Sequence, residues 1–422
     1  MRPRWIRSDV SAILVVGFLT QALTVFSGPL VARMLGPGGR GDLVMVTVIS
    51  IMAAHLASTS LTNAVASVVA RRQGGARDVL GPLLYRWAAA SCIPALVAAA
   101  AVVVLIGDAP HLPLLAIETF LVTLFGCWLN LLRAMLQGEH AVRSVNSSRI
   151  AFSSVYVAAV VGLFVVDRVG SAAYVVPCQL LAQVVALVIS ARSLQPADPA
   201  HPGDHSGAAR EVYQFARQAY VSSLGTTDLL GLDHVLVGLL LGNAELGLYA
   251  VAVSATTLPG IVVTGLSSTL LPRMSARTPE DAAAVMRRWF SAGAAISLAI
   301  VIGIELIIAP ALRIFFGDPF VPATTPARLL VIASALSGMR FLIAAAAQAQ
   351  GNARRASLVD LLSGGVLIVA LTVGARTIGL EGAALGVVVA QVVNCGCLLL
   401  LISWTGKGVR VGPRQRTRTT ST

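Results

Sequence analysis

The sequence predicts an all-α integral membrane protein with about twelve transmembrane helices in two pseudo-twofold related six-helix lobes. Three observations predict this fold. Apolar stretches long enough to cross a bilayer recur along the chain, arginines gather in every second gap between them, and short motifs of the first half return in the second. Hydrophobic residues make up 56% of the 422 residues and charged residues only 12%. Because soluble domains carry about 25% charged residues, this composition excludes an ordinary soluble protein.

Six apolar stretches in each half approach or exceed the roughly 20 residues that a membrane span needs. In the first half they are Val10–Met34, Leu43–Val69, Leu80–Ile106, Leu112–Leu136, Ile150–Val166 and Ala172–Ser190. In the second half they are Ala219–Leu241, Leu248–Leu271, Phe290–Leu312, Leu329–Gln350, Leu358–Ala375 and Ala383–Ser403. The first stretch is longer than the apolar core of a secretory signal, so we expect it to remain as a helix.

The basic residues predict that both termini are cytoplasmic. Arginine and lysine gather at the N-terminus, in the gaps after the even-numbered spans and in the C-terminal tail, whereas the other gaps are poor in them. Loops rich in these residues stay on the cytoplasmic side. The net charge of +12 therefore sits where it meets anionic membrane lipids, and nucleic acid is not an expected partner. We expect a multi-pass protein of the cytoplasmic (inner) membrane.

The chain repeats itself. The gap after the first span reads Leu35-Gly36-Pro37-Gly38-Gly39-Arg40-Gly41, and the gap after the seventh has the same Leu-Gly-x-x-x-x-Gly pattern from Leu241 to Gly247. Gln137-Gly138 likewise returns as Gln350-Gly351. Since six is an even number, the two copies share an orientation, and their pseudo-twofold axis stands along the membrane normal.

The repeat and the composition together predict four regions. Residues 1–192 form the N-terminal lobe, residues 193–212 a cytoplasmic linker, residues 213–405 the C-terminal lobe, and residues 406–422 a basic cytoplasmic tail. The linker is assigned from its prolines and glycines.

The end of the first helix, Ala32-Arg33-Met34-Leu35-Gly36-Pro37, and the two Gln-Gly pairs resemble polysaccharide flippases of the multidrug/oligosaccharidyl-lipid/polysaccharide exporter superfamily. The resemblance implies alternating-access translocation of polyprenyl-diphosphate-linked oligosaccharide across the cytoplasmic membrane, for cell-surface polysaccharide biosynthesis. It also implies lipid-linked oligosaccharide as substrate, and glycan polymerases or glycosyltransferases as protein partners.

No motif in the sequence indicates an enzyme. The sequence contains no His-Glu-x-x-His, no Gly-x-Ser-x-Gly and no phosphate loop with its lysine. The five cysteines all fall inside predicted spans, without the spacing of a zinc site. We therefore expect no cofactor and no metal, with a proton or sodium ion as the candidate for coupling.

Arg340 is the strongest candidate for a substrate contact, because it lies near the middle of the predicted span Leu329–Gln350. A charge at that depth costs roughly 2.5–3.5 kcal/mol on insertion scales, so it faces a cavity or a partner. The guanidinium would suit a diphosphate or a sugar carboxylate in a central cavity. The alternative is a salt bridge that holds helices together. Asp360 opens the eleventh span from the cytoplasmic side, and a role as an interface residue only stays open for it.

Acidic and polar residues of the first and seventh helices complete the predicted cavity. Asp228 and Asp233 are candidates for ion coupling, with Asp228 expected near Arg340. By the duplication, Asp233 corresponds to Ser27 and Thr227 to Gln21. The predicted cavity residues are Arg340, Arg33, Gln21, Ser27 and Thr227.

Two other functions stay open. A multidrug cation antiporter of the same superfamily would need an acidic cavity with aromatic walls, yet aromatics are only 5% of the chain and Arg340 repels cations. A membrane-embedded glycan polymerase or ligase would need an outward-facing catalytic platform, whereas the outer connections here are short.

Overall fold

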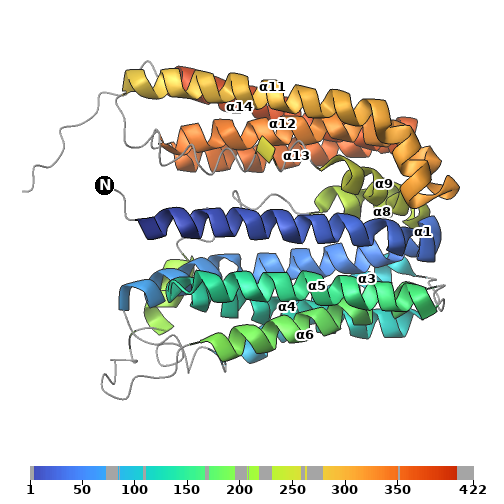
Figure 1. Ribbon diagram of the computed structural model, residues 1–422, viewed down its shortest axis with the longest axis horizontal. Coiled ribbons are helices and arrows are strands. Elements are labelled where there is room, and N and C mark those ends of the chain that lie inside the picture. Colours follow the sequence, from blue (N-terminus) through green and yellow to red (C-terminus); the bar gives the residue numbers. More distant parts are fainter. Residues whose placement is uncertain are drawn as a thin grey trace, which may run out of the picture.

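Figure 1 shows a computed structural model of the chain, which is helical almost throughout its described residues. These residues are 4–72, 84, 86–107, 111–166, 171–194, 207, 209–217, 231–257, 262–263, 279–349 and 352–405. The helices run along the long axis of the molecule, so that most turns between them lie at its two ends (Figure 1).

The N lobe contains α1 and the helices up to α6, and the C lobe contains α8 and the helices after it. The N lobe consists of α1 (Arg4–Arg72), α3 (Cys92–Ile106), α4 (Leu112–Gly138), α5 (Val142–Val166), the short η1 (Ala172–Tyr174) and α6 (Val176–Ser193). The C lobe consists of α8 (Leu232–Leu241), α9 (Asn243–Thr256), α11 (Pro279–Ala311), the π-helix η2 (Leu312–Phe316), the 3-10 helix η3 (Asp318–Ala323), α12 (Thr324–Ala349), α13 (Ala353–Ile378) and α14 (Leu380–Thr405).

The predicted fold class is confirmed. Nine helices within the described ranges are long and apolar enough to cross a membrane, and one of them, Leu19–Arg71, covers most of the first two predicted spans. The seventh and eighth predicted spans fall partly outside the described residues. Large apolar side chains such as Val104, which is 79% exposed, cover the outside of the bundle, as expected where lipid is the solvent.

The long helix α1 is two helices joined by a sharp turn at Gly36. Its backbone has φ 66° and ψ −178° there, a conformation that glycine adopts without steric cost. The first half reaches the end of the molecule near α8 and α9, and the second half returns (Figure 1). We call this end, which holds the turns at Gly36 and Gly242, the turn end.

One apolar cluster joins the two lobes at the turn end. It runs from Val31 and Met45 of α1 to Leu246 and Val251 of α9 and on to Phe320 of η3. Toward the opposite end each lobe has a separate cluster: one in the N lobe around Val65 and Met135, and one in the C lobe around Ala347 and Leu398. The described apolar packing therefore ties the lobes together at one end.

The duplicated Leu-Gly-x-x-x-x-Gly motifs pack directly against each other across the lobes. A Cβ on Gly41 would lie 1.8 Å from the Asn243 backbone oxygen, and a Cβ on Gly247 would lie 1.9 Å from the Pro37 backbone oxygen. Gly41 and Pro37 are the repeat equivalents of Gly247 and Asn243, so the contact is symmetric. We call it the glycine contact. Small residues permit such close approach of membrane helices.

Gly41→Ala should push the lobes apart at the turn end, because the added methyl group meets backbone that cannot move aside. Gly38→Ala is the matched control, since nothing lies within 4 Å of a Cβ there. Spin labels at His111 and Val321, in a background without native cysteines, report the distance between the lobes at this end. Gly41→Ala should lengthen that distance and Gly38→Ala should leave it unchanged. Equal distances in both variants would contradict the packing described.

Candidate substrate and ion sites

Polar contacts reinforce the lobe junction at the turn end. The Asn243 side-chain amide donates to the Asp42 carboxylate at 2.7 Å, and the Arg33 guanidinium donates to the Ile314 backbone oxygen. Each bond joins a residue of α1 to a residue of the C lobe. The predicted cavity residue Arg33 thus lies at this junction, with its side chain exposed.

Asp233, a predicted ion-coupling residue, lies in a polar cluster near the same junction. Its carboxylate lies 3.0 Å from His234 Nδ1 and accepts a hydrogen bond of 2.8 Å from the hydroxyl of Tyr249. The Tyr249 side chain is fully buried. Gly231, on the preceding turn, packs so closely on Val48 of α1 that a Cβ would lie 2.3 Å from its methyl group. The cluster therefore sits on a helix that bears directly on the other lobe.

Arg340 forms the salt bridge that the sequence left open as its alternative role. Its guanidinium donates to the Asp360 carboxylate of α13 at 2.9 Å, and the Asn394 amide of α14 donates to the same oxygen at 3.1 Å. Arg340 is only 6% exposed. Asp360 is therefore the partner of a buried cation on the facing helix, and not an interface residue alone.

The other described residues predicted for the cavity, Gln21, Ser27 and Arg33, all lie on α1. Gln21 is half-buried, and Ser27 is buried with its hydroxyl donating to the Thr24 carbonyl of its own helix at 2.9 Å. Thr227 and Asp228 lie outside the described residues. The carboxylate that the structure shows beside Arg340 is that of Asp360.

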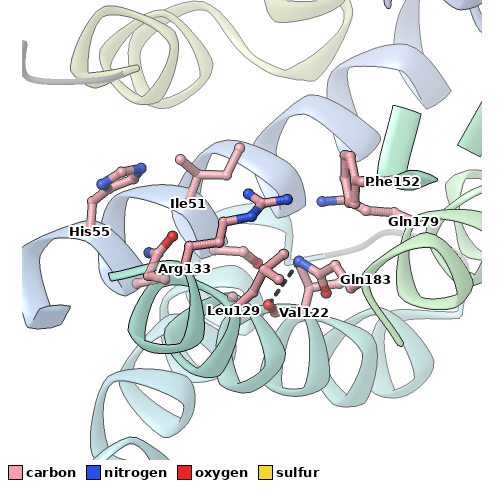
Figure 2. A pocket seen from close by; sticks show the side chains of 12 residues that line it. Ile51, His55, Val122, Leu129, Arg133, Phe152, Gln179 and Gln183 are labelled. Atoms are coloured by element: carbon pink, nitrogen blue, oxygen red, sulfur yellow. Dashed lines mark hydrogen bonds between the residues drawn. The ribbon is translucent and has the colours of Figure 1, made fainter. Parts of the chain in front are cut away.

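A pocket of about 140 Å³ lies inside the N lobe, between α1, α4, α5 and α6. The described residues among those predicted for the cavity do not line it. Its polar lining consists of Ser50, His55, Asn130, Arg133, Gln179 and Gln183. Figure 2 shows the Arg133 side chain rising from α4 into the space between Ile51 of α1 and Gln183 of α6. We call this cavity the N-lobe pocket.

Arg133 was not identified as a site residue from the sequence. It lies near the end of its predicted span, where an arginine is expected to lie at the membrane interface. A signal was present in the spacing of polar residues. Asn130 and Arg133 are three apart on one helix, and Gln179 and Gln183 are four apart on another, so each pair lies on one helical face. Two such faces in adjacent helices of one lobe predict a polar interior.

The family model for polysaccharide biosynthesis proteins matches residues 6–277, which is more than half of the chain. This protein belongs to the polysaccharide biosynthesis protein family. A search of curated proteins finds no match.

Solved transporter structures share the fold along almost the whole chain. The chain is similar to a multidrug resistance MATE family transporter of the MOP superfamily in its inward-facing conformation, with a TM-score of 0.72 at 15% identity, covering 92% of this chain and 96% of that one. It is also similar to the lipid II flippase MurJ in an inward closed conformation, with a TM-score of 0.70 at 12% identity, covering 92% and 87%. A MATE family transporter in its outward-facing conformation is also similar, with a TM-score of 0.61 at 14% identity, covering 94% of this chain and 95% of that one. The chain thus has the fold of MOP-superfamily transporters and flippases.

Asp360→Asn should destabilise the C lobe, because it leaves the buried Arg340 without its carboxylate. Breaking a buried ion pair costs about 3–5 kcal/mol, whereas an exposed pair contributes about 0–1 kcal/mol. Asp318→Asn is the matched control, since Asp318 pairs with Arg313 at 2.8 Å on an exposed surface. Thermal unfolding of the purified protein in detergent should give a clearly lower melting temperature for Asp360→Asn and a nearly unchanged melting temperature for Asp318→Asn. Equal melting temperatures would contradict the structural role of this ion pair.

Proposed function

We propose that this protein is a flippase that translocates polyprenyl-diphosphate-linked oligosaccharide across the cytoplasmic membrane by alternating access. The observation that carries the proposal is the uneven packing of the lobes. One apolar cluster and the glycine contact join them at the turn end, while toward the opposite end each lobe has its own cluster. A carrier that is closed on one side has this arrangement, and its lobes rock to open that side.

Family and conformation agree with this proposal. The family match points to polysaccharide biosynthesis, and a lipid II flippase is among the similar folds. The chain also superposes better on the inward-facing MATE transporter than on the outward-facing one. We take the turn end as the outer face, with both termini cytoplasmic, because the exposed basic residues Arg143 and Arg354 begin helices at the opposite end.

Within this cycle, the predicted cavity residues divide into three roles. We assign Gln21 and Thr227 to the path between the lobes, and Arg33 to the outer closure, where it bonds to the C lobe. Ser27 lies on the same helix as Arg33. Arg340 holds α12 against α13 through Asp360 during the movement of its lobe.

A multidrug cation antiporter is the second candidate, since a MATE transporter shares the fold. The N-lobe pocket argues against it. Arg133 lines this pocket and forms no ion pair with the described residues, so the pocket repels a cationic drug.

A disulfide across the outer closure tests alternating access. Cysteines at Asp42 and Asn243, whose side chains touch at 2.7 Å, should cross-link in a background without native cysteines. In proteoliposomes that contain polyprenyl-diphosphate-linked disaccharide, oxidation should stop the appearance of sugar on the far leaflet, and reduction should restore it.

The single variants Asp42→Cys and Asn243→Cys, treated with the same oxidant, are the controls. Transport by the cross-linked protein at the rate of its reduced form would rule out rocking about this closure. Uptake of a cationic dye by the reduced protein, without movement of the disaccharide lipid, would instead establish the antiporter.

Ion coupling is assigned to Asp233, with Asp228 as the second candidate in the same predicted span. Asp233 is enclosed by His234 and Tyr249 and lies on the helix that touches α1, so loss or gain of a cation there changes the charge at the lobe junction. Asp233→Asn should remove the dependence of transport on an imposed proton or sodium gradient and retain downhill exchange. Glu245→Gln, on neighbouring α9, is the control, and we expect it to keep the wild-type dependence. Unchanged gradient dependence in Asp233→Asn would remove Asp233 from this role.

A further inference from the structure

The two lobes differ in how the charge of an arginine inside the helix bundle is balanced: Arg340 is buried and Arg133 is half-buried. In the C lobe, Arg340 pairs with Asp360. In the N lobe, Arg133 forms no ion pair with the described residues, and its hydrogen bonds there go to the hydroxyl of Ser148 alone, at 3.4 Å from Nε and from Nη2. Arg149 of α5 adds a second positive charge nearby. The N-lobe pocket is therefore cationic, and an anion would supply the missing counter-charge.

The guanidinium of Arg133 is held in a fixed place before any ligand arrives. Ser148 accepts a hydrogen bond of 2.9 Å from Ser190 and lies 3.3 Å from the Ala186 carbonyl, so α6 fixes its position. These bonds use one edge of the guanidinium, which leaves other N–H groups of Arg133 for a ligand. Figure 2 shows the guanidinium among the side chains that line the pocket.

The amides of the pocket offer both acceptors and donors. Gln183 donates to the Val122 carbonyl at 3.3 Å, and its Oε1 is buried without a hydrogen-bond partner among the described residues. Gln183 is only 7% exposed. Gln179 accepts from Thr47 at 3.4 Å, which leaves its NH₂ group as a donor, and Asn130 donates to Ser58 at 3.2 Å, which leaves its oxygen as an acceptor.

This combination of groups favours a hydroxyl-bearing anion over inorganic phosphate. At neutral pH a phosphate ion has one or two hydroxyl donors beside its acceptor oxygens, which is fewer than a sugar offers to the amide oxygens of Gln183 and Asn130. A sugar acid has a carboxylate for the guanidinium and hydroxyl groups that donate to the amide oxygens. Phe152 supplies an apolar wall on which the C–H face of a sugar ring can lie.

The size of the pocket limits what enters it. Its volume of about 140 Å³ is below the roughly 300–1,000 Å³ of pockets for drug-sized ligands. It therefore takes one sugar unit, not a whole oligosaccharide or a polyprenyl chain.

We infer that the N-lobe pocket binds one acidic sugar unit of the transported glycan, with Arg133 contacting its carboxylate and Gln183 accepting from a hydroxyl. The inference rests on the proposed function, since it names the class of glycan that the flippase carries: one that contains a hexuronic acid.

Calorimetric titration of the purified protein with glucuronate, glucose and inorganic phosphate tests the site. The wild type should bind glucuronate at least tenfold more tightly than glucose or phosphate, and Arg133→Gln should lose at least tenfold in affinity for glucuronate. Arg143→Gln, which removes the same charge from an exposed position on α5, should bind as the wild type does. Wild-type affinity in Arg133→Gln, or tighter binding of phosphate than of glucuronate, would overturn the inference.

Gln183→Met is the second variant, and it keeps the charge of the pocket if Arg133→Gln fails to fold. It removes the amide acceptor at nearly constant volume. We expect a three- to tenfold weaker affinity for glucuronate with no change for phosphate. An unchanged affinity for glucuronate would contradict the assignment of this amide.

Transport of two lipid-linked disaccharides, one neutral and one with a terminal glucuronic acid, separates this inference from the proposed function. The wild type should move the acidic substrate faster, and Arg133→Gln should slow the acidic substrate at least tenfold while changing the neutral one little. If the wild type moves neither, the proposed function fails. If Arg133→Gln slows both equally, the flippase assignment stands and the acidic-sugar site is refuted.

Discussion

The arrangement of the two lobes depends on backbone meeting backbone at the glycine contact. Gly41 lies against Asn243 and Gly247 lies against Pro37, at distances that no side chain would permit. Because the two motifs are repeat equivalents, one short sequence supplies both sides of the interface. Around this contact gather the apolar cluster that joins the lobes and the bonds from Asp42 and Arg33. Separation of the lobes at this junction would break only a few polar bonds and would uncover apolar side chains such as Met45 and Leu246.

Hydropathy and the repeat sufficed to predict the fold, because both are properties of long segments. A bilayer-spanning helix needs many consecutive apolar residues, so the signal is strong and the number of spans follows from it. The Leu-Gly-x-x-x-x-Gly repeat gave the symmetry, and the structure adds that its two copies touch. The sequence could not show this contact, since it depends on how the second half of α1 packs on α8 and α9.

The individual charged residues were harder to predict. The depth of Arg340 in its span showed that this residue needed a partner, but it could not decide between a substrate and a protein side chain, and it did not identify Asp360 as the partner. Arg133 escaped notice for the reverse reason, because its place near the end of a span gives no sign that the side chain turns inward. In both cases the role of the arginine depends on which neighbouring helix its side chain faces. Asp233 was found because an acidic residue within a span is rare, and the structure adds its partners His234 and Tyr249.

We propose that the lobes rock about a closure at the turn end, and two distances measured in the same reconstituted protein test this movement. One pair of spin labels, at His111 and Val321, spans the turn end, and another, at Arg143 and Arg354, spans the opposite end. When lipid-linked oligosaccharide is added, we expect a population with a longer distance at the turn end and a shorter distance at the opposite end. Two distances that stay constant, or that lengthen together, would contradict it.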